Sequence, residues 1–530
     1  MLIGVAMKNK LLVIGICLVL LIGACVGTLA TQEKSYTRVI QHEISVSLND
    51  LSEQDQKAAS SLALDVDSFA SHLPVVRIDT AGQTIPGAVL HQGIEDKSFT
   101  AQMDISGAEI EEENDYTTYT VAEDGRNTVQ SSFTLYNNPE GINRLTDSPD
   151  VESWAEVRYR GHSSRSFDKK SYALTLTKQD RVTDNPKNIL DMGSEESWIL
   201  YGPFLDKTLL RNYLSLNLAG QFMEYVPDVR FCELFVNDEY QGLYLLMESV
   251  KYGQDRVAMT PSDPRTPQTS YLVRRDWKDV NAPYQFDDFL EMTNQTQDTP
   301  VEVLYPSDLI ITPQQWEWIQ SDFNSIEKAL YSYDYDTSLY GYWTTLDSDT
   351  FIAYAIMNEF SGNSDAGSYS TYFYKDARGK LCIGPVWDFN NAYNNYFEID
   401  MSSVGFLMPN SPLYFMLYKD ETFVDGVIAR YKQLRLGVLS DAYIDSFIDK
   451  TIEYLGPAID RNYEIWGYSF DPALLAPSNK LTPDERNPQD YEQAVHDLKE
   501  AISDRGEWLD ENIDNLHQYS HESVNKGYNH

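Results

Sequence analysis

Two predicted strands and the loop between them occupy the stretch Val157-Arg-Tyr-Arg-Gly-His-Ser-Ser-Arg-Ser-Phe-Asp-Lys-Lys-Ser-Tyr-Ala-Leu-Thr-Leu-Thr177. The second strand alternates Tyr172, Leu174 and Leu176 on one face, which is typical of a half-buried strand. The loop is rich in Gly and Ser, and five of the fifteen residues from Arg158 to Tyr172 are cationic. Small residues let backbone N–H groups approach a phosphate, and the cations add charge. The stretch predicts a phosphate-binding loop; an exposed hairpin with ordinary surface charges is the alternative.

The charge of the whole chain excludes one class of partner. Of 530 residues, 81 are Asp or Glu and 41 are Lys or Arg, so the net charge is −40. Because such a chain repels polyanions, we expect no nucleic-acid partner. Hydrophobic residues make up 42% of the chain, which is enough for a sizeable core and argues against wholesale disorder.

The first thirty residues have the pattern of a targeting segment. Lys8 and Lys10 precede an uncharged apolar run, and Ile22-Gly-Ala-Cys25 has the aliphatic-small-small-Cys order of a bacterial lipoprotein signal. Residues 1–30 therefore predict a signal that leaves Cys25 lipidated, an uncleaved helical membrane anchor, or a signal for free secretion. The first two place the remaining chain in an extracytoplasmic location, on the outer face of the bacterial cell membrane.

Patterning along the rest of the chain predicts an α+β protein with a β-rich first half and an α-rich second half. The regions are a polar tether with some helix over 31–70, a β-rich lobe over 71–250, an α-rich lobe over 251–516 and a polar tail over 517–530. We expect a hairpin of Phe231–Val236 and Tyr240–Met247, a helix capped by Thr312 and Pro313, and helices near 206–223, 349–360 and over most of 421–516. Cys232 and Cys382 lie on strand-like segments and either pair or remain free thiols.

Two further loops carry acidic side chains. Asn358-Glu-Phe-Ser-Gly-Asn-Ser-Asp365 ends an apolar helix, and Gly384-Pro-Val-Trp-Asp-Phe-Asn390 follows a strand-like segment. Asp and Asn oxygens suit Mg²⁺ or Mn²⁺, and a carboxylate that leaves a helix can serve as a general base. Solvated turn residues are the alternative interpretation of each loop. A cationic loop followed by two acidic loops is what phosphoryl transfer requires.

The order of these motifs resembles the CotH family of spore-coat and cell-surface kinases. The resemblance covers about residues 70 to 516 and includes Arg-Gly-x-Ser-Ser with Lys-Lys-Ser-Tyr, Trp198-Ile-Leu, Asp206-Lys-Thr-Leu-Leu-Arg-Asn212, Leu234-Phe-Val-Asn-Asp-Glu-Tyr-Gln-Gly-Leu-Tyr244, Gly384-Pro-Val-Trp-Asp-Phe and Phe423 to Arg435. It implies an atypical protein-kinase-like fold with a β-rich N-lobe and an α-rich C-lobe. It also implies transfer of the ATP γ-phosphoryl group to Ser or Thr of a partner protein, with Mg²⁺ or Mn²⁺.

The resemblance also assigns roles to individual residues. Asp365 corresponds to the catalytic aspartate, and Asp388 with Asn390 corresponds to the metal-binding motif. Lys169 or Lys170 would hold the ATP phosphates. We slightly prefer Lys170, because it lies two residues before Tyr172 and so would share its face of the strand. Arg160 would support that loop, and Met247 and Glu248 would lie at an inter-lobe hinge that contacts adenine.

Two positions depart from the family pattern and keep an alternative open. Family members often have Asp where this chain has Asn390, and ordinary kinases have a metal-binding Asn where this chain has Ser370. The alternative is a catalytically weak or inactive kinase-fold protein that acts in surface or spore-coat assembly or adhesion. The negative charge of the chain favours a basic partner, such as a Ser- and Lys-rich surface or coat protein.

Overall fold

The computed structural model describes residues 37–91, 118–279, 282–290, 299–523 and 525. The predicted targeting segment, with Cys25, lies outside these residues. The chain divides into two units, Met1–Thr37 and Arg38–His530, and the elements named below belong to the second. Within the described residues, no helix has the length and apolar character needed to cross a membrane.

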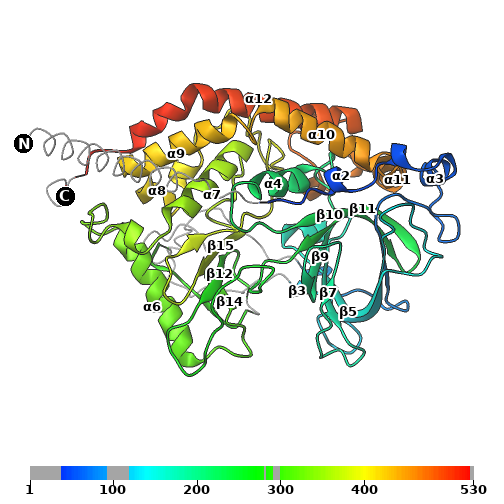
Figure 1. The fold of residues 1–530 in the computed structure, drawn as a ribbon, viewed down its shortest axis with the longest axis horizontal. Coiled ribbons are helices and arrows are strands. Elements are labelled where there is room, and N and C mark those ends of the chain that lie inside the picture. Colours follow the sequence, from blue (N-terminus) through cyan, green and yellow to red (C-terminus); the bar gives the residue numbers. More distant parts are fainter. Residues whose placement is uncertain (1–36, 92–117, 280–281, 291–298, 524, 526–530) are drawn as a thin grey trace, which may run out of the picture. The chain divides into compact units, whose positions relative to one another are not determined.

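A closed β-barrel forms the N-terminal part of this unit, with strand order β1-β10-β11-β9-β6-β5-β4 (Figure 1). Taken in that order, the strands span Val75–Asp79, Val229–Val236, Glu239–Glu248, Ser197–Tyr201, Tyr172–Thr177, Val151–Tyr159 and Val129–Tyr136. All neighbours are antiparallel except β1 and β10, which are parallel. Two small sheets pair β2 with β3 and β7 with β8, and these strands span Val89–His91, Thr118–Tyr119, Lys187–Asn188 and Ser194–Glu195.

Alternation of side chains decides what the barrel encloses. Phe133 of β4, Leu174 of β6 and Trp198 belong to one buried cluster. Along most of β4 and β6, buried residues alternate with more exposed ones. β10 is buried along its whole length, because α4 (Arg211–Ala219) also packs on it. Asn237 and Asp238 have φ of 49° and 66°, as a two-residue turn with positive φ at both positions requires. The predicted hairpin is confirmed.

A second, five-stranded antiparallel sheet lies in the region predicted to be α-rich. Its order is β13-β14-β12-β15-β16, and the strands span Gln285–Phe286, Val301–Tyr305, Tyr271–Arg275, Thr371–Lys375 and Cys382–Ile383. The sequence analysis missed β12 and β14, because a five-residue apolar run has no periodicity that separates a strand from a helix.

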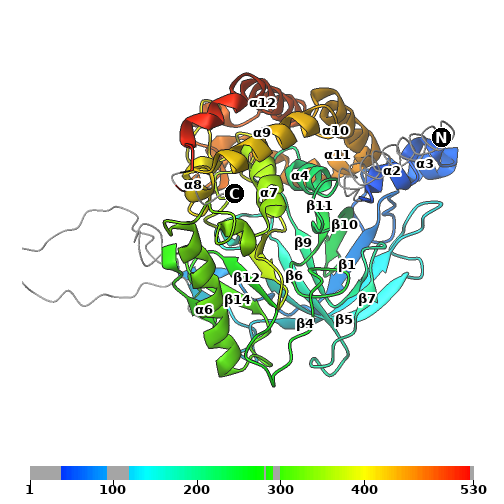
Figure 2. The ribbon, with the colours of Figure 1, turned by 60° about the vertical axis from the view of Figure 1, so that its left-hand side comes forward.

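Helix α6 (Pro313–Leu330) packs against this sheet (Figure 2). Its N-terminus confirms the predicted cap: Thr312 Oγ1 accepts from Gln315 N, and Gln315 Oε1 accepts from Thr312 N. Phe323 meets Phe373 of β15 with ring centroids 5.5 Å apart.

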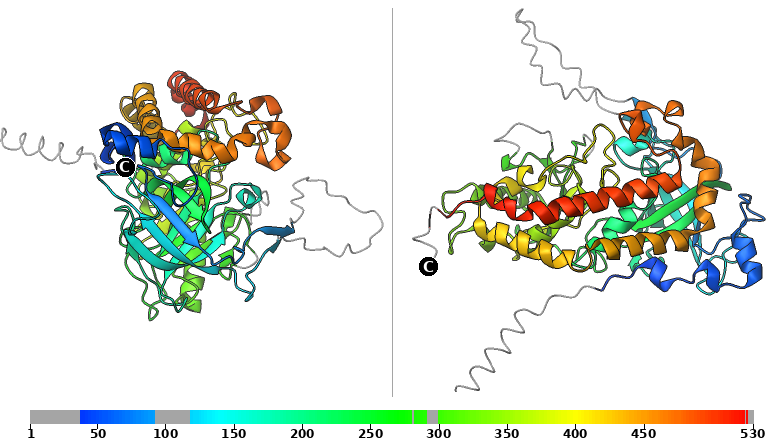
Figure 3. Two further views of the ribbon diagram at one scale, coloured as in Figure 1. Left: turned by 90° about the vertical axis from the view of Figure 1, so that its right-hand side faces the viewer. Right: turned by 90° about the horizontal axis from the view of Figure 1, so that it is seen from above.

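The remaining helices cover the barrel and the second sheet on one side. They are α7 (Ser348–Ser361), α8 (Tyr414–Leu417), α9 (Glu421–Arg435), α10 (Asp441–Leu455), α11 (Pro457–Trp466) and α12 (Tyr491–Asn512). Figure 3 shows α12 alongside α9 and α10, and Tyr431 Oη donates to Asp510 Oδ1 at 2.8 Å between α9 and α12. Short 3-10 helices span Leu48–Asp50, Ser163–Ser166, Tyr342–Thr344, Met408–Asn410, Gly467–Phe470, Pro472–Leu474, Pro477–Asn479, Asp484–Arg486 and Ile513–Tyr519.

The described part of the predicted tether packs on the barrel region. It includes helices α2 (Gln41–Ile44) and α3 (Glu53–Ala59). Arg38 pairs with Asp228 at 2.8 Å, and the buried Gln41 side chain exchanges hydrogen bonds with the backbone of Phe231. These buried contacts hold residues 38–70 in place, so this stretch is part of the folded unit. Cys232 and Cys382 are both free thiols.

Candidate active site

The cationic loop begins where β5 ends and includes the 3-10 turn Ser163–Ser166. Gly161 has φ of 106°, and a Cβ there would overlap Ser164 Oγ, so the turn requires glycine. Arg160 N donates to Ser171 O at 2.9 Å, which closes the loop at its base. The Arg160 guanidinium lies 5.8 Å from the ring centroid of Trp387. The loop therefore reaches the segment that carries Asp388.

The Asp388 loop follows β16 and is fixed from both sides. Asp388 has φ of 61°, and the next residue, the buried Phe389, donates its N–H to Asn212 Oδ1 of α4 at 2.9 Å. Asn395 Nδ2 donates to Asn390 O at 2.7 Å. These contacts explain why Asp388 is directed inward although it lies in a loop.

Asp365 approaches the same place from another direction. Gly362, which has φ of 63°, caps the C-terminus of α7, and Asp365 follows it in a turn. Asn391 Nδ2 donates to Asp365 Oδ2 at 3.1 Å, and Tyr393 N donates to Ser361 O at 2.7 Å. These bonds join the two acidic loops predicted from the sequence.

The surroundings of Asp388 perturb its carboxyl group. Burial raises the pKa of the Asp388 carboxyl to about 6, with further contributions from the charges of Asp365 and Asp276, while Arg160 lowers it. Asp276 follows β12, and the sequence analysis did not identify it. The charges of Asp365 and Asp276 therefore act on Asp388, and a cation bound at Asp388 would relieve this repulsion.

The oxygen atoms present fit a hard divalent cation. Asn390 Oδ1 is buried with no hydrogen-bond partner among the described residues, and Asn390 Nδ2 donates to Asn391 Oδ1 at 3.2 Å. A carboxylate with a neighbouring amide oxygen is a ligand set that Mg²⁺ and Mn²⁺ accept. Asp388 and Asn390 could therefore hold such an ion.

Several arginines cluster around the cationic loop. Burial, and then the nearby charges of Arg165 and Arg160, lower the pKa of Arg158 to about 10, and Arg274 contributes further. Arg165 Nε and Arg274 Nε are buried without hydrogen-bond partners in the described part of the chain. Like charges that repel each other and have unused donors favour an anionic ligand such as a phosphate. Arg274 lies on β12, a strand that the sequence analysis missed.

An aromatic stack connects the barrel loop to the acidic loops. The His162 ring lies parallel to Trp277 with centroids 5.3 Å apart, and Trp277 stacks on Tyr369 at 4.2 Å. His162 belongs to the cationic loop, and Tyr369 follows Asp365 by four residues. The stack joins the loop of the barrel to the second sheet beside the site.

The two lysines predicted to bind phosphate have other partners. Lys169 is buried, and its Nζ donates to Leu243 O and Asn462 Oδ1, both at 2.7 Å. Burial also lowers its pKa well below the ordinary value, which works against a permanent charge. Lys170 Nζ donates to Arg165 O at 2.7 Å, so it braces the cationic loop. The structure does not bring Lys169 to the site.

Met247 and Glu248 lie at the end of β11, and both are buried. Glu248 pairs with Arg256 at 2.6 Å and accepts hydrogen bonds from Tyr225 Oη and Asp228 N. Burial raises the Glu248 pKa to about 7. This network is internal to the protein, and none of these bonds involves the acidic loops.

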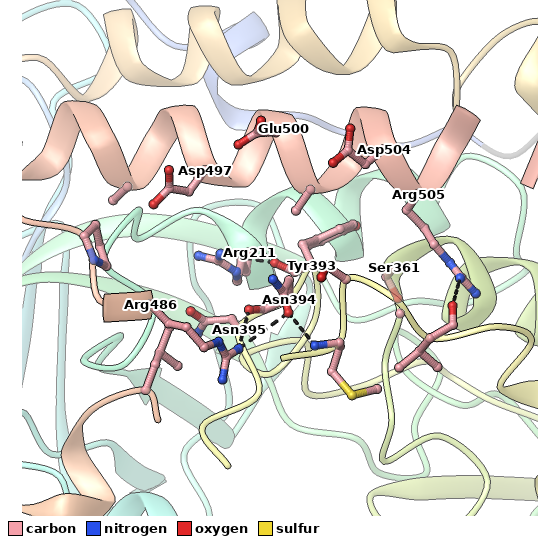
Figure 4. Close-up of a pocket in the computed structure, with 18 of the residues that line it drawn as sticks. Arg211, Ser361, Tyr393, Asn394, Asn395, Arg486, Asp497, Glu500, Asp504 and Arg505 are labelled. Atoms are coloured by element: carbon pink, nitrogen blue, oxygen red, sulfur yellow. Dashed lines mark hydrogen bonds between the residues drawn. The ribbon is translucent and has the colours of Figure 1, made fainter. Parts of the chain in front are cut away.

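A cavity of about 350 Å³ lies behind the acidic loops (Figure 4). Asp497, Glu500 and Asp504 of α12 line one side, and Arg486 and Asn394 lie on the other. Arg486 Nη2 donates to Asn394 O at 3.0 Å, so this arginine is engaged in structure. The acidic side chains of α12 give the cavity a wall of negative charge.

The fold and site define a class: a mixed α+β protein in which arginines of a barrel loop face aspartates carried by a second sheet and its loops. A comparison with protein families specifies the class further. The family described as CotH kinase protein matches residues 157–509, and the chain belongs to this family. The resemblance found in the sequence is confirmed.

One curated relative is similar over most of its length. Inner spore coat protein H of Bacillus subtilis (strain 168) is 21% identical over 367 residues, which cover 68% of this chain and 87% of the relative.

Proposed function

We propose that this protein is an extracytoplasmic kinase that transfers the γ-phosphoryl group of ATP to Ser or Thr of a partner protein. The observation that carries the proposal is the convergence of Arg160, Asp365 and Asp388 from three separate loops, in a chain of the CotH kinase family. The finer fold assignment belongs to the same proposal: an atypical protein-kinase-like fold in which the barrel serves as the N-lobe.

Each group of residues has a role in this reaction. Arg160 and its neighbouring arginines bind the phosphates, and Asp388 with Asn390 holds Mg²⁺ or Mn²⁺, which supplies charge neutralisation when bound. Asp365 orients the acceptor hydroxyl and accepts its proton. The hydroxyl oxygen forms a bond to the γ-phosphorus, the bond from phosphorus to the β–γ bridging oxygen breaks, and ADP leaves.

The acceptor and location follow from charge and from the N-terminal pattern. The net charge of −40 and the acidic wall formed by α12 support a basic acceptor, such as a Ser- and Lys-rich surface or coat protein. The relative is itself named a spore coat protein, which supports a role near the coat but names no acceptor. The pattern of residues 1–30 supports attachment to the outer face of the membrane through lipidated Cys25 or an N-terminal helix.

The test is phosphate transfer from γ-labelled ATP by residues 31–530, with Mg²⁺ or Mn²⁺ and a basic protein as acceptor. Asp388→Ala should abolish transfer, because it removes the proposed metal ligand. Asp349→Asn is the matched control: Asp349 is exposed in the first turn of α7, the helix that precedes Asp365. Equal activity of Asp388→Ala and the wild type would show that the site is misassigned.

A second candidate is a kinase-fold protein that acts in surface or coat assembly without catalysis. It is favoured by Lys169, which is buried away from the site, and by Ser370 at a position where kinases hold metal. This candidate predicts no saturable binding of ATP with Mn²⁺. A clear thermal stabilisation of the wild type by ATP and Mn²⁺, absent in Asp388→Ala, would refute it.

A further inference from the structure

The pairing of β12 with β15 fixes the position of Asp276. Arg274 pairs with Tyr372 and Arg275 with Thr371, so the next pair along this antiparallel register is Asp276 with Ser370. The pair after that is Trp277 with Tyr369, and these rings stack at 4.2 Å. Counting one residue beyond the last pair brings Asp276 opposite Ser370, where the φ of 48° at Ser370 ends the extended strand.

The face on which Asp276 lies follows from its neighbours. Arg274 and Asp276 are two residues apart, share a face, and approach to 3.4 Å. Arg275 points to the opposite face, where it pairs with the buried carboxylates of Asp288 and Glu327. Asp276 thus lies on the same side of the sheet as Arg274, and its charge acts on Asp388.

Asp276 has two partners in the structure: its Oδ1 accepts from Trp277 N at 3.0 Å, and its Oδ2 lies 3.4 Å from Arg274 Nη1. Arg274 Nη2 has a closer partner in Glu302 Oε2, at 2.6 Å, on the neighbouring strand β14. The side chain of Asp276 is 17% exposed, so its carboxylate is largely shielded from water. A carboxylate oxygen with only one long ionic contact keeps lone pairs that a divalent cation can use.

We propose that Asp276 supplies the second carboxylate of the divalent-metal site, in place of the ligand that Ser370 does not provide. The inference rests on the proposed function and deepens it. In protein kinases a second metal ligand comes from the catalytic loop. Here a carboxylate from the adjacent strand reaches the same position, so the site retains two acidic ligands although it lacks an acidic residue at Asn390.

The test measures binding of Mn²⁺ alone and of Mn²⁺ with a non-hydrolysable ATP analogue, by electron paramagnetic resonance. Asp276→Asn should weaken Mn²⁺ binding by at least about tenfold, as the loss of groups around metal sites commonly does. Glu302→Gln is the matched control, because it removes the other carboxylate partner of Arg274 and lies away from Ser370. We expect wild-type Mn²⁺ affinity for this control.

A thiol substitution separates ligation from structural support. In a Cys382→Ser background, which removes the partly exposed free thiol, Asp276→Cys should bind Cd²⁺ with a thiolate-to-metal charge-transfer absorption that the Cys382→Ser parent lacks, while its Mn²⁺ affinity falls. A residue that only supports the fold would not produce this band.

The outcomes distinguish the inference from the proposed function. Wild-type Mn²⁺ affinity in Asp276→Asn, or no Cd²⁺ band in folded Asp276→Cys, would overturn the role of Asp276. If Asp388→Asn also kept wild-type Mn²⁺ affinity, the metal site itself would be wrong, and the proposed function would fail with it.

Discussion

Replacement of Asp388 by Asn should stabilise the metal-free protein while it removes metal binding. The two side chains have nearly the same shape, and Asn tolerates the positive φ of 61° found at this position. What changes is the charge, which the metal-free site holds close to Asp365 and Asp276. The expected stabilisation is unusual, because most substitutions of partly buried residues destabilise a protein.

The magnitude follows from the pKa of Asp388. Burial and neighbouring charges raise it from 3.8 to about 6. Two pKa units correspond to about 3 kcal/mol between the two protonation states. Because the side chain is partly exposed, solvent screening reduces the expected gain to about 1–2 kcal/mol. In a protein of this size, that gain raises Tm by on the order of 2 °C.

The same pKa sets the direction of the pH dependence. A carboxyl whose folded pKa lies above its unfolded value binds protons more tightly in the folded state, so stability falls as pH rises through that window. For Asp388 the window runs from 3.8 to about 6. Its destabilising contribution is therefore fully present above the window and decreases progressively as the pH falls through it.

The assay is thermal unfolding of the wild type and Asp388→Asn in EDTA, at neutral pH and near pH 5. At neutral pH the variant should be more stable, and the difference should shrink near pH 5. Adding Mn²⁺ should stabilise the wild type and leave the variant unchanged. A variant less stable than the wild type in EDTA at neutral pH, with its fold intact by circular dichroism, would refute the reasoning.

Two further substitutions test the loop. Gly161→Ala should weaken nucleotide binding roughly ten- to a hundredfold by displacing the cationic loop, and it should leave Mn²⁺ binding without nucleotide unchanged. Gly82→Ala is the control, since Gly82 also has a positive φ and a Cβ there would meet open space. Equal nucleotide affinities in the two variants would contradict the prediction. Lys169→Met should keep ATP affinity and lose about 1–3 kcal/mol of stability, because it leaves Leu243 O and Asn462 Oδ1 without their donor. Loss of ATP binding in a folded Lys169→Met would restore Lys169 as a phosphate ligand.

Local signals in the sequence predicted much of the fold. The capping residues Thr312 and Pro313, the Asn237-Asp238 turn and the alternation in residues 172–177 each depend on neighbouring residues, and each is confirmed. Closure of the barrel depends instead on β1 pairing with β10 and β4, and Val75 pairs with Glu233, far along the chain. Nothing local in the sequence specifies such a partner.

The site was predictable to the extent that its residues lie in loops with distinctive composition. Asp365, Asp388 and Arg160 were found in this way, and they converge in the structure. The alternation of side chains along the strand could not decide between Lys169 and Lys170, because both residues precede the strand, which begins at Tyr172. Arg274 and Asp276 were missed because β12 was not recognised; a cationic residue and an acidic residue two positions apart at a strand end were the available signal.

The carboxylates near Asp388 stay close despite their repulsion, because other contacts hold the elements that carry them. Buried ion pairs of Arg275 with Asp288 and Glu327 fix β12, and the Asn212–Phe389 bond fixes the Asp388 loop to α4. These contacts keep the carboxylates from moving apart, so their repulsion remains in the metal-free state. Binding of a cation between the carboxylates would relieve this repulsion, and this relief adds to the free energy of coordination. A rigid frame that buries Asp388 near Asp365 and Asp276 therefore accounts for the raised pKa of Asp388 and for the stabilisation expected in Asp388→Asn, and it agrees with the proposed role of Asp276.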